Sequence, residues 1–188
     1  MKKTPQQKQF VQLAGEFGVV SELCRREVQA SLTYGNSKSA DIFVISKSGS
    51  RAAKLEVKSS TVDSWIVGKQ AETVAPHIVW IFVYFPKFPT TFSPAQVAEN
   101  GAGSPHYHVL TSAEVKTLYD QKIAEAAVVK PKKRKTSSTS AELGLLETFD
   151  GDATADEQLK PFITFNKGDL QKHYGLWNKV SKALADSK

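Results

Sequence analysis

The stretch "HIVWIFVYF", residues 77 to 85, constrains the fold of this chain more than any other feature, because it is an unbroken apolar run. A strand with one face in water alternates apolar and polar residues, so a continuous run predicts a strand covered on both faces. Pro86 and Pro89 end the run, since proline cannot donate a hydrogen bond to a sheet. The chain must therefore place material on both sides of a central sheet.

The surrounding sequence supplies that material as helices and further strands. Thr4 and Pro5 form a good helix start. The apolar residues that follow at helical spacing are Phe10, Leu13, Ala14, Phe17, Val20 and Cys24, which we expect to form the buried stripe of a helix ending near Arg26. We expect strands at 28–33, 41–46, 51–58, 64–67, 106–110 and 162–165, and helices at 112–126, capped by Ser112, and 168–184. This order predicts an α/β sandwich with a central mixed sheet, which contains an antiparallel meander and is flanked by helices.

Composition and cysteine content narrow the class of protein. Hydrophobic residues make up 40% of the 188, which is enough for a substantial core. The single cysteine, Cys24, excludes an intramolecular disulfide framework, and we expect it to pack in the core. No apolar run is long enough to span a bilayer, and the N-terminus has no signal-like apolar segment, so a soluble, cytoplasmic protein is expected.

Charge and composition divide the chain into three parts. We expect a main domain at 1–127, a flexible linker or insertion at 128–160, and a C-terminal strand and helix at 161–188 that dock on the main domain. The run "KPKKRK" at 130–135 carries five of the 25 Lys and Arg residues, and the rest of the chain is close to neutral. Its Lys132, Lys133 and Arg134 are candidates for gripping phosphates, although a solvated linker or a localisation signal fits the same composition.

A charged stripe runs along the expected strand "AKLEVKSS", residues 53 to 60. Leu55 and Val57 point to one face, which leaves Glu56 and Lys58 on the other. If the hairpin turn is 47–50, Asp41 lies opposite Glu56 on the preceding strand. Two carboxylates so placed repel each other unless a cation lies between them, and an ammonium nearby can orient a nucleophile. The alternative is an ordinary solvated strand face with an acid at the strand entrance.

These residues resemble the PD-(D/E)xK nuclease superfamily. The resemblance rests on Asp41, a hairpin, and then "EVK" at 56–58, behind an N-terminal helix. The surroundings "GEFGVVSEL", "YGNSKSADIFVIS" and "LEVKSS" look most like a small stand-alone bacterial and archaeal branch, similar to Holliday junction resolvases and restriction endonuclease-like proteins. The similarity covers about residues 10 to 125. Ala40 stands where the motif that names the family has proline.

The resemblance implies a restriction endonuclease-like fold and a Mg²⁺- or Mn²⁺-dependent endonuclease acting on DNA, with RNA not excluded. It implies that Asp41, Glu56, the backbone carbonyl of Val57 and Glu16 bind the metal, and that Lys58 orients the attacking water. It also places a few residues toward the substrate, namely Ser60, Trp65 and Lys69. A homodimer is compatible with the family. The alternative is a module on the same fold that binds nucleic acid or protein without cutting it.

Overall fold

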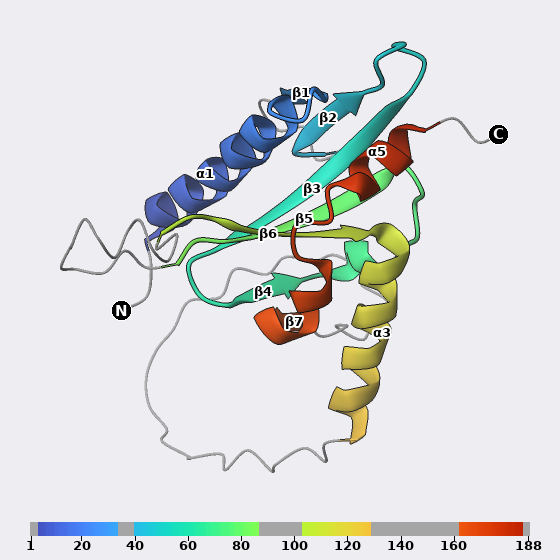
Figure 1. Cartoon of the computed structure of the whole chain (residues 1–188). Coiled ribbons are helices and arrows are strands. Elements are labelled where there is room, and N and C mark those ends of the chain that lie inside the picture. Colours follow the sequence, from blue (N-terminus) through green and yellow to red (C-terminus); the bar gives the residue numbers. More distant parts are fainter. Residues whose placement is uncertain (1–3, 34–39, 87–102, 129–161, 186–188) are drawn as a thin grey trace, which may run out of the picture.

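The chain folds around a five-stranded mixed sheet (Figure 1). The structure is a computed structural model, and it describes residues 4–33, 40–86, 103–128 and 162–185. The strands of this sheet, in spatial order, are β1 (Gln29–Leu32), β2 (Ile42–Ile45), β3 (Ala52–Ser60), β5 (Ile78–Tyr84) and β6 (His106–Thr111). Only β3 and β5 pair in parallel, and the other neighbours are antiparallel. The predicted α/β class and mixed sheet are confirmed.

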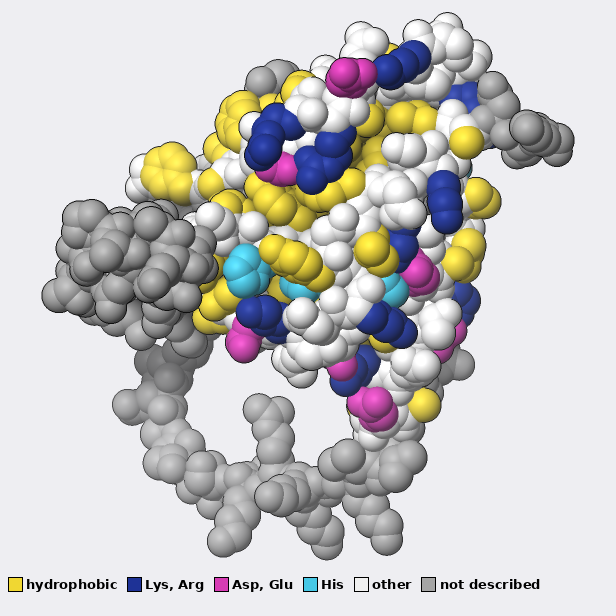
Figure 2. All heavy atoms as spheres, viewed as in Figure 1, with side chains coloured by type: hydrophobic (Ala, Val, Ile, Leu, Met, Phe, Trp, Pro, Cys, Tyr) yellow, Lys and Arg dark blue, Asp and Glu magenta, His cyan; other side chains and the backbone are white. Residues whose placement is uncertain are grey.

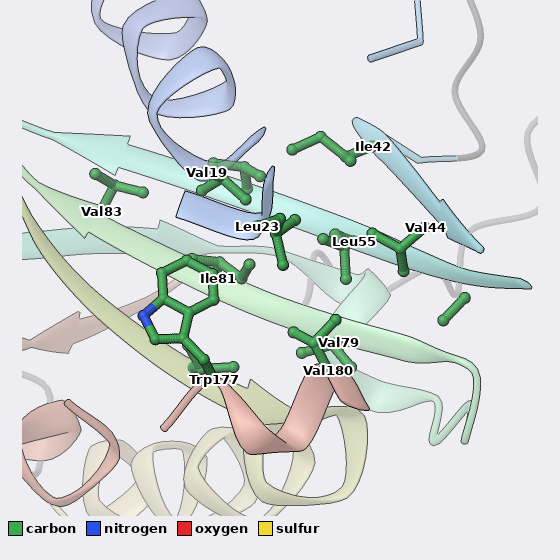
Figure 3. Close-up of a cluster of buried hydrophobic side chains, with 13 residues drawn as sticks. Val19, Leu23, Ile42, Val44, Leu55, Val79, Ile81, Val83, Trp177 and Val180 are labelled. Carbon is green, nitrogen blue, oxygen red and sulfur yellow. The ribbon is translucent and has the colours of Figure 1, made fainter. Parts of the chain in front are cut away.

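Two layers cover the sheet, as the apolar run at 77–85 predicts. The first consists of α1 (Pro5–Cys24) and α5 (Asn178–Leu184), whose Val19, Leu23, Trp177 and Val180 pack on the sheet (Figure 3). The second consists of α3 (Ser112–Val128) and a two-stranded sheet of β4 (Ser64–Val67) and β7 (Ile163–Asn166). The middle five residues of β5 are buried, because its side chains alternate between these two cores.

Helix α1 begins as predicted but turns a different face to the sheet. Thr4 accepts a hydrogen bond from the Gln7 backbone, and the Gln7 side chain returns one to Thr4, which is a capping box. The buried positions, however, are Gly15, Glu16, Val19 and Leu23. The predicted stripe was wrong: Phe10 is 61% exposed and Phe17 is 53% exposed. Cys24 is also exposed, which corrects its predicted core position.

The reason for this choice of face is the close approach of α1 to β3. A Cβ atom built at Gly15 would lie 1.7 Å from Ser59 Oγ and 2.9 Å from Ser59 Cβ. Only glycine permits this spacing, so the face of α1 with the smallest side chain packs on the sheet. The larger Phe10 and Phe17 could not occupy that position at the same distance.

The C-terminal segment contains two short helices instead of the single helix predicted at 168–184. The chain passes through α4 (Lys167–Leu170) and the 3₁₀ helix η2 (Gln171–His173), turns at Gly175 with φ 65°, and enters α5. A left-handed glycine ends a helix, which explains the break. The break lets the segment serve both cores, because Leu170 packs with Trp65 while Trp177 packs with Val19.

Helix α3 also begins differently from the prediction. Thr111 and Glu114 form its capping box: Thr111 Oγ1 accepts from the Glu114 backbone at 3.3 Å, and Glu114 accepts from the Thr111 backbone at 2.8 Å. The predicted cap, Ser112, instead accepts from Ala75 N and donates to Thr73 O, which fastens the loop before β5. Among the described helices, none has the length and apolar character needed to cross a membrane.

Candidate functional site

The β2–β3 hairpin has the register on which the predicted site depends. The turn comprises residues 47–50, with Gly49 at φ 72°, and Ser46 N donates to Arg51 O at 2.9 Å. Ile42 pairs with Leu55 and Ile45 with Ala52, so the predicted register is confirmed. Continued by one residue, this register brings Asp41 toward Glu56.

Asp41 does not extend the ladder by that last pair, which corrects the expected direct opposition. Its backbone N–H donates to Leu55 O at 3.1 Å, whereas a residue directly opposite Glu56 would make no backbone hydrogen bond to β3 at this point of the ladder. Its carboxylate Oδ2 accepts a hydrogen bond from Val57 N at 2.7 Å. Asp41 is therefore attached to the strand that carries the "EVK" residues.

Strand β3 separates its two faces as predicted. Leu55 and Val57 are buried in the core beneath α1. Glu56 and Lys58 are half-buried on the opposite face, where the Lys58 ammonium lies 5.8 Å from the centre of the Trp80 ring. At that distance the aromatic face attracts the ammonium and holds it near Glu56.

The third carboxylate, Glu16, reaches the same end of the sheet from α1. It is only 7% exposed, and its Oε1 accepts a hydrogen bond from Gln12 Nε2 at 3.0 Å. Burial raises the pKa of Glu16; the Gln12 hydrogen bond opposes this shift, and the Asp41 carboxylate adds to it. Glu16 is therefore close enough to Asp41 for the two charges to interact.

Glu56 experiences the same kind of environment. Burial is the largest cause that raises its pKa, the Asp41 carboxylate raises it further, and Lys58 and Lys54 oppose the shift. Asp41 thus repels a carboxylate on either side of it. A divalent cation bound among these oxygens would reverse the repulsion, and oxygen ligands are those that Mg²⁺ prefers.

The described side chains do not form a complete metal coordination site by themselves. Within the ranges that the structure describes, no three His, Cys, Asp or Glu side chains cluster closely enough to hold an ion by themselves. The side chains fit an ion that keeps several water ligands, which is the usual state of protein-bound Mg²⁺. Asp41 and Glu56 would be its ligands from the hairpin, with Glu16 and the Val57 carbonyl as further candidates.

A cleft of about 470 Å³ opens beside these residues. Four segments line it: the first half of α1, Asp41 just before β2, the end of β3, and the β3–β4 loop with the beginning of β4. The lining includes Lys8, Gln12, Asp41, Lys58, Ser59, Ser60, Ser64, Trp65 and Ile66. The lining combines apolar side chains with a few polar and charged ones, which is a common form of ligand site. The sequence analysis missed Lys8 and Gln12, although they precede Glu16 at intervals of four residues and so share its face of the helix.

The residues expected to contact nucleic acid have different outcomes. Ser60 lines the cleft, where its Oγ accepts from Val62 N at 3.1 Å. Trp65 also lines the cleft, but it is only 3% exposed and its Nε1 donates to Val83 O at 3.1 Å, so most of its ring packs in the core. Lys69 lies on the 3₁₀ helix η1 (Lys69–Glu72), outside the residues that line the cleft. The basic residues Lys132, Lys133 and Arg134 lie outside the described residues.

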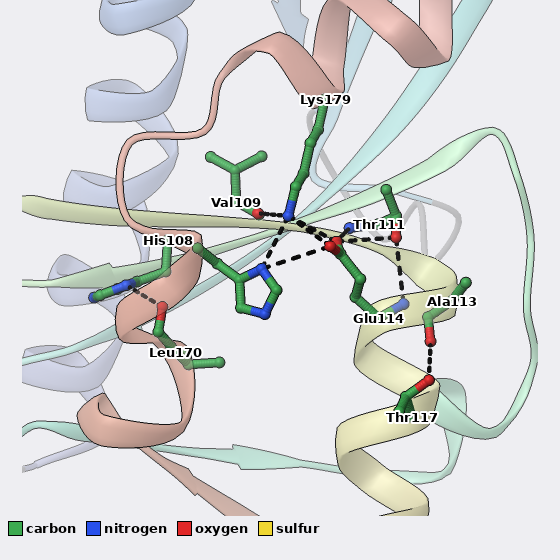
Figure 4. A network of polar contacts seen from close by, with 9 residues as sticks. His108, Val109, Thr111, Ala113, Glu114, Thr117, Leu170 and Lys179 are labelled. Atoms are coloured by element: carbon green, nitrogen blue, oxygen red, sulfur yellow. Dashed lines mark hydrogen bonds and ion pairs between the residues drawn. The ribbon is translucent and has the colours of Figure 1, made fainter.

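A second polar cluster, also missed from the sequence, joins the C-terminal segment to the start of α3 (Figure 4). The Lys179 ammonium donates to both Glu114 carboxylate oxygens at 2.7 and 2.9 Å, to Val109 O at 2.9 Å, and to His173 Nδ1 at 2.9 Å. Burial opposes ionisation, but the hydrogen bonds from Lys179 and Thr111 lower the pKa of Glu114. These contacts bind α5 to β6 and to the start of α3, so we interpret the cluster as structural.

Comparison with known proteins identifies no relative of this chain. The chain matches no protein-family model, no curated protein and no solved structure. The function must therefore be argued from the site itself.

Proposed function

We propose that this protein is a metal-dependent nuclease that hydrolyses phosphodiester bonds in DNA. The observation that carries the proposal is the attachment of the Asp41 carboxylate to Val57 N, between Glu56 and Lys58 and beside a cleft. The contact supports the proposal because the resemblance to the PD-(D/E)xK superfamily expects Asp41 beside Glu56 and Lys58. We further propose that the sheet is a divergent form of the restriction endonuclease-like fold.

The proposed roles follow from the chemistry of each group. Asp41 and Glu56 would hold Mg²⁺ or Mn²⁺, with Glu16 and the Val57 carbonyl completing the protein's share. When bound, the ion would neutralise charge on the phosphodiester and lower the barrier to attack by water. Lys58 would orient that water, or stabilise the charge that grows on the phosphate. The Trp80 ring below Lys58 restricts where its ammonium can go.

The cleft supports an extended anionic substrate. Lys8 on α1 and Lys58 on β3 stand on different walls, so a nucleic-acid backbone between them would meet a cation on each side. Serine and glutamine side chains on the lining can donate to phosphate oxygens. The choice of DNA over RNA therefore rests on the family resemblance, because contacts to phosphate oxygens are common to both.

The competing function is a binding module that holds nucleic acid without cutting it. The retained set of Asp41, Glu56 and Lys58 favours the enzyme, because binding alone does not require two acids beside the phosphate path. Such acids repel phosphate unless a cation is present.

The test is a cleavage assay on linear, supercoiled, single-stranded and branched DNA and on RNA, with Mg²⁺, Mn²⁺ or EDTA. We expect cleavage with metal, none with EDTA, and a loss of at least about a hundredfold in Asp41→Asn and Lys58→Ala. Lys182→Ala is the matched control, because Lys182 is an exposed lysine on α5 and lies outside the cleft lining. Absence of cleavage on every substrate, or equal cleavage by Lys58→Ala, would refute the enzymatic proposal. Cleavage of RNA alone would retain the mechanism and change the substrate.

A further inference from the structure

Three aromatic side chains form a row that leads from the cleft across the end of the central sheet, and we call Tyr84, His106 and Tyr174 the aromatic row. Ser60, which lines the cleft at the end of β3, pairs with Tyr84 on β5. Tyr84 pairs in turn with His106 on β6, and the centres of their rings lie 5.6 Å apart. The ring of Tyr174, which follows η2, lies 5.7 Å from that of His106. Paired residues share a face of a sheet, so the row continues the face of β3 that carries Glu56.

Tyr174 is the exposed member of the aromatic row. It retains 51% of its surface, whereas Tyr84 and His106 are half-buried. Two imidazole rings contact the Tyr174 ring, those of His106 and the fully buried His108, at interplanar angles of 81° and 66°. The Tyr174 backbone is also fixed, because it forms a β-bridge with His108. A ring that is held in place while half of it faces water is a preformed platform, on which a flat ligand can stack without first ordering the protein.

A cation accompanies the aromatic row. The Lys167 ammonium lies 5.2 Å from the centre of the Tyr84 ring, close enough for the face of the ring to attract it. Burial lowers the pKa of His106, and the charge of Lys167 lowers it further, so His106 is a neutral ring at neutral pH. Figure 2 shows a face of the molecule on which histidine side chains lie between Lys and Arg side chains. A ligand on the aromatic row would therefore meet positive charge beside the rings.

A hollow of about 290 Å³ opens beside Tyr174. Its lining includes Glu22, Arg26, Tyr107, Tyr174 and Trp177. The Arg26 guanidinium lies 4.8 Å from the centre of the Trp177 ring, and the Tyr107 ring lies 5.3 Å from that ring. Glu22 adds an acid to the hollow, but its carboxylate is paired with Arg26. Aromatic rings and guanidinium planes are the groups on which unpaired bases stack in proteins, so the hollow extends the platform of Tyr174.

We propose that the aromatic row and the hollow beside Tyr174 bind the unpaired bases of a single-stranded nucleic acid whose backbone continues into the cleft. The inference rests on the proposed function in that it takes the ligand of the cleft to be a nucleic acid. Rings placed among the cations Lys167 and Arg26 match a polymer in which bases alternate with phosphates. A duplex is a poor match, because its base faces are stacked inside and do not reach a protein ring. The substrate is therefore a single strand, or a duplex with an unpaired arm.

Fluorescence anisotropy with two labelled strands of about 15 nucleotides separates the bases from the phosphates. One strand is oligothymidine, and the other is an abasic strand of the same length and charge. We expect the wild type to bind oligothymidine at least about fivefold more tightly, Tyr174→Ala to lose this preference, and Tyr174→Phe to keep it, because the ring remains. Phe17→Ala is the matched control, since Phe17 is a ring of similar exposure (53%) that lines neither the cleft nor the hollow. Lys167→Ala should weaken the binding of both strands alike and reduce the slope of log affinity against log salt concentration by about 0.7.

The binding measurement contains EDTA, so no strand is cut, and the loss of metal affects the two strands equally because they carry the same charge. Equal binding of the two strands by the wild type, or an unchanged preference in Tyr174→Ala, would overturn the proposal. So would a blunt duplex whose binding falls as much in Tyr174→Ala as that of oligothymidine. Thermal melting of each variant shows that a lost preference is not an unfolded chain.

The outcomes also separate this site from the proposed hydrolysis. Metal-dependent cleavage without a Tyr174-dependent preference would refute the base-binding site and leave the nuclease standing. A Tyr174-dependent preference in a chain that cuts no substrate would keep the base-binding site and refute the nuclease. An oligouridine of the same length, measured in parallel, shows whether the strand bound is DNA or RNA.

Discussion

Gly15→Ala tests whether α1 is seated on β3 as closely as the structure shows. In a free helix this change is favourable by about 1 kcal/mol, because alanine loses less backbone entropy than glycine. Here the added methyl would lie 1.7 Å from Ser59 Oγ and 2.9 Å from Ser59 Cβ. Rotation of Ser59 can relieve the first contact but not the second, so part of the helix must shift. Overpacking of this kind typically costs about 1–3 kcal/mol, so after the gain of about 1 kcal/mol we expect a net loss of up to about 2 kcal/mol in the free energy of unfolding.

Urea unfolding followed by circular dichroism measures that loss. Gly168→Ala is the matched control: Gly168 lies in α4, and a Cβ there would meet nothing within 4 Å. We expect that variant to be as stable as the wild type or up to about 1 kcal/mol more stable. In a double-mutant cycle, Ser59→Gly should rescue Gly15→Ala, since it removes both contacting atoms. A stabilised Gly15→Ala, equal to Gly168→Ala, would show that α1 does not approach β3 this closely.

The remaining predictions concern charge and core packing. The pKa of Glu16 is raised, so its ionisation makes the wild type less stable as pH rises from about 4.5 through the folded-state pKa. Glu16→Gln should therefore be more stable than the wild type at pH 8 and equally stable near pH 4. The midpoint of urea unfolding at each pH measures this difference. The pH dependence for Glu114 is the reverse, because its pKa is lowered: its stabilising contribution is present at neutral pH and is lost on acidification through its folded-state pKa. Glu114→Gln should therefore lower the melting temperature at pH 7 and have little effect near pH 3. An equal effect at both pH values would contradict the ion pair with Lys179. Trp177→Ala should lower the free energy of unfolding by about 3–5 kcal/mol, because this 7%-exposed indole fills the core between α5 and the sheet. A loss below about 1 kcal/mol in urea unfolding would mean that α5 does not dock there.

The β-strands were the most predictable part of the fold. Alternation and turn chemistry fixed the hairpin with residues 47–50 as its turn, and the continuous run at 77–85 became the buried β5. The register of that hairpin also brought the acid of β2 next to "EVK". These features are local, because side-chain period and turn length determine them within about 20 residues.

The face of α1 and the course of the C-terminal segment were not predictable in the same way. The stripe through Phe10 and Phe17 and the stripe through Gly15 and Val19 have the same period, and only the close approach to Ser59 selects the second. Gly175 breaks the last helix because Leu170 and Trp177 serve cores on opposite faces of the sheet. Both outcomes depend on tertiary packing, which overrides the pattern of a single helix.

The turn of Asp41 toward Val57 N is the remaining detail that the sequence did not reveal. An ideal ladder would have continued to an Asp41–Glu56 pair, but the carboxylate accepts the backbone N–H of Val57. The ladder stops at the Ile42–Leu55 pair, and the Asp41 charge acts on both Glu56 and Glu16. The resemblance to a nuclease family pointed to Asp41, Glu56 and Lys58. The hydrogen bond from Val57 N to Asp41 attaches Asp41 to the strand that carries the other two residues.

Titration calorimetry with Mg²⁺ and Mn²⁺ tests most directly whether these three carboxylates form a cation site. We predict one ion per chain in the wild type, and binding at least tenfold weaker in Asp41→Asn, because Asp41 lies between the other two acids. Asp120→Asn, which removes an exposed acid paired with Lys116 on α3, should bind the ion as the wild type does. No binding by the wild type at millimolar metal, or equal binding by Asp41→Asn, would contradict the metal site and the hydrolysis proposed for it.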